Sequence, residues 1–423
     1  MRHFIITLLA AFVLSSPALA ETWAITNGVI HTMGNDGVLK KGTVVIENGR
    51  IVAVGADVKV PANAEVIDAT GKVVTPGFMD PSSYFGLVEV SAEDPTVDAT
   101  TESERITAAH SVADAVNPRS TLIPVNRIEG VTRAITQPAS GKSIFAGRSA
   151  LISLGSVDNF LLNRNAAMHV TLGEYGSELS GGSRGAALTK LRESLEDARD
   201  FGNNRRAFES AGRYEYSLSR PDLEALQPVL KGELPMVVEV ERASDIEAVL
   251  RMAEEFKLRV VILGGSEAWM VAGKLARANV PVILDPLQNL PSSFEQTAST
   301  LKNAAALHSA GVTISFTSGG SHNARNLKQG AGNAVAHGLP WTAALEALTV
   351  NPAKIFGVPN YGRIAAGQDA DVVVWDGDPL ETSTFADHVF IQGRNIPMES
   401  RQTKLRDRYL NLDEDRPQAY DKP

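Results

Sequence analysis

Residues 236–265, MVVEVERASDIEAVLRMAEEFKLRVVILGG, contain the unit that decides the fold. The apolar run Met236–Val240 predicts a buried strand, and Ser244 is expected to cap a helix over residues 245–256, whose apolar side chains recur at helical spacing. The next apolar run, residues 259–263, predicts a second buried strand. A strand, a helix and another strand in about 30 residues predict a βαβ unit with parallel strands.

The alternation of predicted strands and helices continues toward the C-terminus. Apolar runs at 280–285 and 312–318 predict two more strands, separated from their neighbours by helical segments. A (β/α)8 barrel fits this repeat and the chain length, and its functional side chains are expected on loops at the C-terminal ends of the strands. An open doubly wound sheet is the alternative, but no G-x-G-x-x-G turn supports a nucleotide crevice.

The two ends of the chain have a different sequence pattern from the middle. Residues 22–75 and 360–398 are short alternating runs broken by turns such as Asn27-Gly28 and Asn48-Gly49, a pattern typical of hairpins. They predict one small β-sandwich domain assembled from both ends, which leaves residues 76–359 for the barrel. The charged segment 399–423 is expected to be a mobile tail, and the polar stretch 202–216 a surface loop.

The first twenty residues have the layout of a secretory signal peptide. A short basic start precedes an apolar run of about a dozen residues, too short to span a bilayer, and small residues precede a cleavage point after Ala20. The protein is therefore expected to be secreted, in the periplasm, with no membrane span after cleavage.

Composition excludes several kinds of partner and chemistry. The formal net charge is −9, which argues against nucleic acid and against an anionic membrane surface. The chain has no cysteine, so disulfides, thiolate metal ligands and a cysteine nucleophile are excluded.

Four segments together resemble the amidohydrolase superfamily, in the branch near imidazolonepropionase. They are NGVIHTM…GTVVIENGRIVAVG, GKVVTPGFMD, the barrel stretch VVEVERASDIEAVLRMAEEFKLRVVILGGSEA, and EALTVNPAKIFGVPNYGRIAAGQDADVVVWDGDPL. The resemblance implies a distorted (β/α)8 barrel that holds one or two divalent metals and hydrolyses an amide or another C–N bond.

The resemblance also shows where this chain departs from the family. The His-x-His pair after the first barrel strand, the two later histidines and the late aspartate fall on Ser82, Tyr84, Glu239, Gly264 and Gly319. A lysine that some relatives use to bridge two metals falls near Ser153. Of the five principal positions, only Glu239 carries a strong metal ligand, so no metal or other cofactor is expected.

Other side chains offer little to replace that site. The isolated histidines have no metal-binding spacing, and only His322 is expected near the barrel mouth. Glu239 is a candidate general base, either paired with a residue such as Arg242 or with a raised pKa. Ser82 is a possible nucleophile, assisted by Tyr84. The loop 138–148 is interpreted as lining the pocket.

Two functions remain open on this basis. The first is a non-catalytic protein that has lost its metal centre. It would bind a small-molecule ligand, or act as a subunit of a homo-oligomer or of a hetero-oligomer with an active amidohydrolase relative. The alternative is an active hydrolase of C–N bonds that uses zinc or another divalent metal at an unidentified site, or Glu239 as base. In either case Ser82, Tyr84, Glu239, Gly264 and Gly319 are expected to converge at the barrel mouth, with Glu239 bonded to Tyr84, Ser82 or Arg242.

Overall fold

The computed structural model describes residues 22–205, 216–320 and 322–410. The predicted signal peptide and most of the predicted surface loop lie outside these residues. Within them, no helix combines the length and the apolar character needed to cross a membrane.

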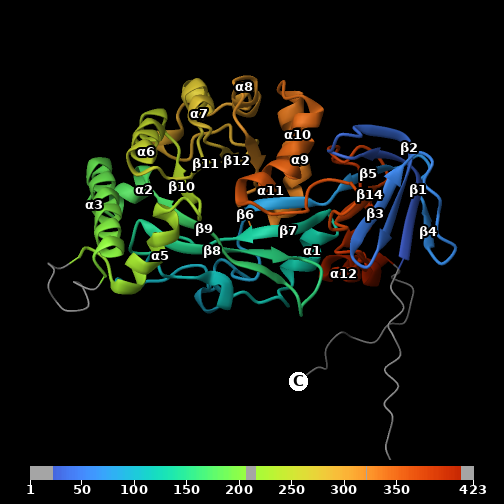
Figure 1. Cartoon of the computed structure of the whole chain (residues 1–423), viewed down its shortest axis with the longest axis horizontal. Coiled ribbons are helices and arrows are strands. Elements are labelled where there is room, and N and C mark those ends of the chain that lie inside the picture. The colour runs from blue at the N-terminus through green and yellow to red at the C-terminus, as the bar shows by residue number, and fades with distance from the viewer. Residues whose placement is uncertain (1–21, 206–215, 321, 411–423) are drawn as a thin grey trace, which may run out of the picture.

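The central element is an eight-stranded sheet that curls into a nearly closed barrel (Figure 1). Its strands are paired in sequence order: β6 (Phe78–Ser83), β7 (Val131–Thr136), β8 (Phe145–Ser153), β9 (Leu161–Thr171), β10 (Met236–Val240), β11 (Val260–Gly264), β12 (Val282–Leu284) and β13 (Ile314–Phe316). The (β/α)8-type fold class is thereby confirmed. The barrel is distorted, because β8 runs antiparallel to both of its neighbours.

Helices cover the outside of the barrel (Figure 1). They are α1 (Leu122–Arg127), α2 (Gly173–Glu178), α3 (Arg184–Asn203), α5 (Arg220–Leu230), α6 (Ala243–Phe256), α7 (Ala272–Ala278), α8 (Asn303–Ser309), α9 (Leu327–Ala336), α10 (Trp341–Leu348) and α11 (Val350–Phe356). Their apolar faces pack on the outward side chains of the strands and form the main core. The predicted cap at Ser244 is wrong: α6 begins at Ala243, after Arg242.

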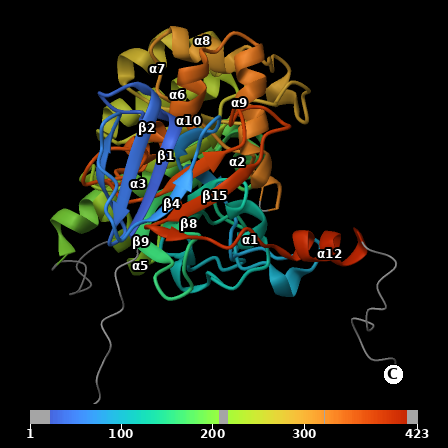
Figure 2. The ribbon, with the colours of Figure 1, turned by 90° about the vertical axis from the view of Figure 1, so that its right-hand side faces the viewer.

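A second sheet is built from both ends of the described chain. Its strands are β1 (Thr22–His31), β2 (Val38–Glu47), β3 (Arg50–Gly55), β4 (Glu65–Asp68), β5 (Val73–Pro76), β14 (Val372–Trp375), β15 (Ala386–Ile391) and β16 (Arg394–Asn395). The junction is the antiparallel pairing of β5 with β14. Figure 2 shows the N-terminal strands beside β15 on one face of the molecule.

Buried charges join this sheet domain to the barrel. Arg133 in β7 donates from Nη2 to Asp371 Oδ2 and to Asp369 Oδ2, both at 2.8 Å, and its guanidinium lies 4.5 Å from the ring centre of Tyr361. Lys328 in α9 is also buried: it donates to the backbone oxygen of Thr384 in the C-terminal part of the sheet domain, and its charge is paired with Glu129 of the barrel at 3.2 Å. Apolar contact accompanies these pairs, because Phe78 stacks on Trp375 at 5.1 Å between ring centres.

Two boundary predictions differ from the structure. Part of the expected mobile tail forms helix α12 (Arg401–Leu410), and Gln402 in it accepts a hydrogen bond from Arg325 at 2.8 Å. The predicted surface loop begins inside α3, which continues to Asn203. Of these two segments, residues 206–215 and 411–423 lie outside the described residues.

Candidate functional site

A cavity of about 180 Å³ opens at the C-terminal end of the barrel strands; we call it the mouth cavity. Thr171 is the last residue of β9, Glu239 the second-last of β10 and Leu263 the second-last of β11. The lining residues are Tyr84, Gln137, Pro138, Ala139, Ser140, Ala146, His169, Val170, Thr171, Tyr175, Val237, Glu239 and Leu263. Residues 138–140 therefore line the pocket, as predicted for their loop.

Glu239 is the only charged side chain that lines the mouth cavity. Strand alternation places Val237 and Glu239 on the inner face of β10, while Met236, Val238 and Val240 pack outward against the helices. The carboxylate accepts a hydrogen bond from Thr171 Oγ1 to Oε2 at 3.0 Å. Glu239 is accessible at the open mouth, but the protein surrounds its carboxylate closely enough to remove much of its water, in line with the expected partial burial.

The pKa of Glu239 is raised above its ordinary value. Loss of water from the carboxylate on burial is the main cause, and the hydrogen bond from Thr171 acts in the opposite direction. Repulsion from the carboxylates of Glu241 and Glu295 raises the pKa further. The Glu239 carboxyl therefore keeps its proton to a higher pH than an isolated glutamate does. Shifted pKa values of this kind are common at catalytic and ligand-binding sites.

The predicted hydrogen-bond partners of Glu239 are wrong. The hydrogen-bond partner in the structure is Thr171, from the neighbouring strand β9. Arg242 instead pairs with Asp245 at 2.8 Å. Tyr84 has no hydrogen bond to Glu239 among the described contacts; burial raises the pKa of Tyr84, and repulsion from the Glu239 carboxylate adds to the rise.

His169 and Gln137 are site residues that the sequence reasoning missed. His169 is 4% exposed, and burial lowers its pKa to about 3, so the imidazole is neutral. Its Nε2 atom and the Oε1 atom of the buried Gln137 lack hydrogen-bond partners in the structure. The alternation in residues 166–171 (AAMHVT) marks a strand end with His169 and Thr171 on one face, and this signal was available in the sequence.

Ser82 and Gly319 lie in a second cluster where β6 meets β13, rather than among the residues that line the cavity. Thr317 Oγ1 lies 2.8 Å from Ser82 O and 3.1 Å from Asp80 Oδ1, and it accepts from the Gly319 backbone N–H at 3.0 Å. Asp80 is fully buried, and its Oδ2 atom has no partner. Burial raises the pKa of Asp80 to about 7, against the hydrogen bonds from Ser82 N–H and Thr317.

Gly264 does not widen the cavity, because the Glu241 side chain fills the space beside it. A Cβ atom at this position would lie 2.5 Å from Glu241 Oε1. Glu241 is itself fixed by Ser266, whose N–H and Oγ donate to its Oε2 at 2.7 and 2.6 Å. Gly319, by contrast, has open space beside it.

The Gly264→Ala variant is expected to lower the free energy of unfolding by about 2–3 kcal/mol, from backbone strain and displacement of Glu241. Gly264 has φ +91°, a left-handed conformation that disfavours any side chain. Urea denaturation measures the change. Gly319→Ala is the control, because φ +62° also carries strain there but no atom lies within 4 Å. Equal losses in both variants would contradict the role given to the Glu241 contact.

Ser153 was assigned to the wrong end of the barrel. Strand β8 is antiparallel, and Ser153 at its end pairs with Arg133 near the start of β7. The mouth cavity lies instead near Ala146, at the beginning of β8. Ser153 therefore cannot occupy the place of a metal-bridging side chain at the mouth.

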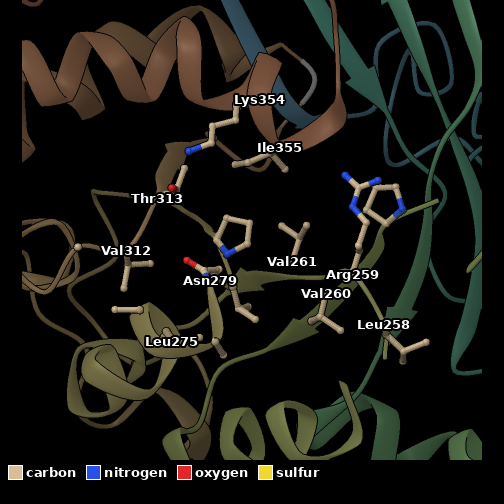
Figure 3. A pocket seen from close by; sticks show the side chains of 16 residues that line it. Leu258, Arg259, Val260, Val261, Leu275, Asn279, Val312, Thr313, Lys354 and Ile355 are labelled. Atoms are coloured by element: carbon tan, nitrogen blue, oxygen red, sulfur yellow. The ribbon is translucent and has the colours of Figure 1, made fainter. Parts of the chain in front are cut away.

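A larger cavity, of about 400 Å³, lies at the opposite end of the barrel (Figure 3). Residues just before or at the start of β11, β12 and β13 line it, among them Val260, Pro281 and Thr313. Among its lining side chains, Lys354 lies at the top and Arg259 at the right in Figure 3. Barrel enzymes place their chemistry at the C-terminal ends of the strands, so the mouth cavity is the candidate site.

Comparison with known proteins accounts for this architecture. The model of the amidohydrolase family matches residues 243–396. The crystal structure of an amidohydrolase from Thermotoga maritima MSB8 superposes with a TM-score of 0.80 and 26% identity, over 88% of this chain and 99% of that one. The chain belongs to the amidohydrolase superfamily.

Curated members of the superfamily are similar over less of their own length. The chain is 27% identical to the amidohydrolase tasK of Hapsidospora irregularis over 394 residues, which cover 83% of this chain and 39% of tasK. It is 49% identical to the imidazolonepropionase of Geobacillus kaustophilus over 63 residues, 13% of this chain and 15% of that enzyme. The chain thus spans about two fifths of tasK and a smaller part of imidazolonepropionase.

The amidohydrolase superfamily implies a divalent metal, and the residues at the mouth do not fit one. A catalytic metal is held by three or four nitrogen or oxygen ligands with an open position. Across residues 22–205, 216–320 and 322–410, no three histidine, aspartate or glutamate side chains are grouped so that they could hold an ion. His322, expected near the mouth, is exposed and does not line the cavity.

Proposed function

We propose that this amidohydrolase-superfamily protein binds a small polar ligand in the mouth cavity and has lost the metal centre of the family. The observation that supports this most is the donor set of the cavity. Ser82, Gly264 and Gly319 stand at family ligand positions without lining the cavity, and Glu239 has Thr171 rather than a second ligand beside it. Barrel proteins usually bind small ligands at the C-terminal mouth of the barrel, where a few polar groups converge.

The proposal includes export and assembly. The basic, apolar and small-residue layout of residues 1–20 supports secretion into the periplasm. A protein without its own catalysis would act through its ligand, or as a subunit beside another copy of itself or an active amidohydrolase relative. Size-exclusion chromatography with light scattering on the processed protein tests the self-assembly part.

Metal content tests the proposal directly. Protein purified without chelator is expected to carry well under one equivalent of zinc, manganese or iron, because a lone carboxylate in water binds these ions weakly. Inductively coupled plasma mass spectrometry measures the content. A Glu239→Gln variant is the matched sample, and both proteins should give the same low value. One equivalent that disappears in the variant would overturn the loss of the metal centre.

A second candidate function is hydrolysis of a C–N bond with Glu239 as general base. The position of Glu239 in the lining of the mouth cavity, its raised pKa and the family membership favour it. In that reaction the carboxylate, held by Thr171, would take a proton from water as the water attacks the substrate carbonyl carbon. Ammonia or amine release from cyclic and acyclic amides, absent in Glu239→Gln, would favour this function over a binding role.

A further inference from the structure

We propose that the mouth cavity selects a small organic monocation with N–H donors, an alkylguanidinium or alkylammonium ion, whose charge offsets Glu239. The inference rests on the proposed ligand-binding function and names its ligand class. It goes beyond family membership, because it follows from the charges and unpartnered atoms of this cavity.

The charge of the cavity comes from one carboxylate. Among the lining residues, Glu239 is the only one with a formal charge, since the neutral His169 contributes none. The hydrogen bond from Thr171 engages one carboxylate oxygen, Oε2. A cationic ligand with at least two N–H groups would supply the missing positive charge and donate to Glu239 in the geometry that carboxylates bind best.

Two buried acceptor atoms support a ligand rich in N–H donors. Gln137 is 6% exposed and its Oε1 atom has no partner, and Nε2 of His169 is likewise unpartnered. Buried polar groups in native proteins are normally hydrogen-bonded, so these two acceptors beside the cavity would favour a ligand that donates N–H groups to them. An amide oxygen only accepts hydrogen bonds, and neutral Nε2 accepts one when the proton is on Nδ1.

The surroundings of the mouth are acidic as well. Glu295 follows β12 and reaches across the mouth, where its Oε2 accepts from the Glu174 N–H at 2.7 Å and from Arg184 Nη2 at 3.2 Å. Arg184 is also shared with Asp245 at 3.1 Å, and Arg242 is held by Asp245. Both guanidiniums therefore already have carboxylate partners, and Glu239 and Glu241 have no cationic partner in the described contacts.

The cavity walls suit an organic cation. Tyr84 and Tyr175 line the cavity, and Tyr175 is fixed by donating from its hydroxyl to Ser140 O at 3.2 Å. Aromatic rings attract cations through their negative faces. A volume of about 180 Å³ equals about six water molecules at the density of the liquid, so the ligand or the part of it that enters has about six heavy atoms.

Three probes of six heavy atoms each separate charge from size: ethylguanidinium, ethylurea and butyrate. Binding to the full processed protein is measured by ligand-observed NMR and calorimetry at low salt. Ethylguanidinium is expected to bind at least tenfold more tightly than ethylurea, with butyrate weakest. Its affinity should rise with pH, because Glu239 must be ionised, and the titratable groups that face it are Tyr84, His169, Glu241 and Glu295.

Glu239→Gln keeps the shape of the side chain and removes its charge. The variant is expected to lose the tenfold preference for ethylguanidinium while it still binds ethylurea. Glu254→Gln, on the exposed side of α6, is the matched control and should retain the preference. Thermal unfolding of both variants, expected to match the native protein, shows that the change is local.

The outcomes separate the two proposals. Preference for ethylurea or butyrate would overturn the cation inference and leave a ligand-binding mouth in place. Absence of binding by all three probes at 10 mM would also overturn the inference. Stoichiometric metal in the same samples would instead overturn the proposed function. Retention of cation preference in Glu239→Gln would show that Glu239 is not the selecting group.

Discussion

Replacing Arg133 by Met is expected to lower the free energy of unfolding by about 3–5 kcal/mol, the cost of leaving a buried charge without its partner. Arg133 is 3% exposed, and the side chain of its partner Asp371 is 1% exposed. The pKa of Arg133 is raised by the Asp371 and Asp369 carboxylates, which outweigh the effect of burial. Urea denaturation followed by circular dichroism measures the loss.

An exposed ion pair serves as the control. Arg164 pairs with Asp114, and both side chains are more than half exposed, so Arg164→Met should change stability by about 1 kcal/mol or less. Adding Asp371→Leu to Arg133→Met should recover part of the loss, because the orphaned charge is then removed. A loss below about 1 kcal/mol in Arg133→Met would contradict the view that this contact holds the barrel and the sheet domain together.

The second large effect concerns Asp80 and pH. The unfolded chain ionises Asp80 near its ordinary pKa of 3.8, whereas the folded protein keeps the proton until about pH 7. Between these values the folded state binds more protons than the unfolded state, so stability falls as pH rises. At about 1.4 kcal/mol per pKa unit, the loss amounts to about 4 kcal/mol, complete above pH 7.

Asp80→Asn tests this prediction, because the amide cannot ionise at this site. Unfolding free energies of both proteins are measured from pH 4 to pH 8, and the difference between the two curves isolates Asp80 from other titrating groups. The native protein should lose stability relative to the variant across this range. Parallel curves would show that the carboxyl is already ionised in the fold, for example through a cation bound at its unpartnered Oδ2 atom.

The apolar runs in the sequence were sufficient to predict the positions of the parallel strands β10 to β13. Strand β10 lies where the sequence predicted it, at Met236–Val240, because its apolar residues are buried on both faces and only Glu239, near its end, is not apolar. Strands β12 and β13 are shorter than predicted, since hydrogen-bonded pairing ends before the apolar run does. The antiparallel β8 was missed, because direction depends on which distant strand it meets.

The sequence by itself determined the superfamily, the two-part fold and the position of Glu239, because these follow from strand spacing and motifs within single segments. Only the tertiary structure decided which groups meet Glu239. Thr171, His169 and Gln137 come from β9 and the end of β7, and Glu295 from the loop after β12. It also decided the pKa of Asp80, which depends on burial and on Thr317, 237 residues away. Side-chain chemistry is a property of the residue, whereas dielectric surroundings and partners arise only when separate strands close into a barrel.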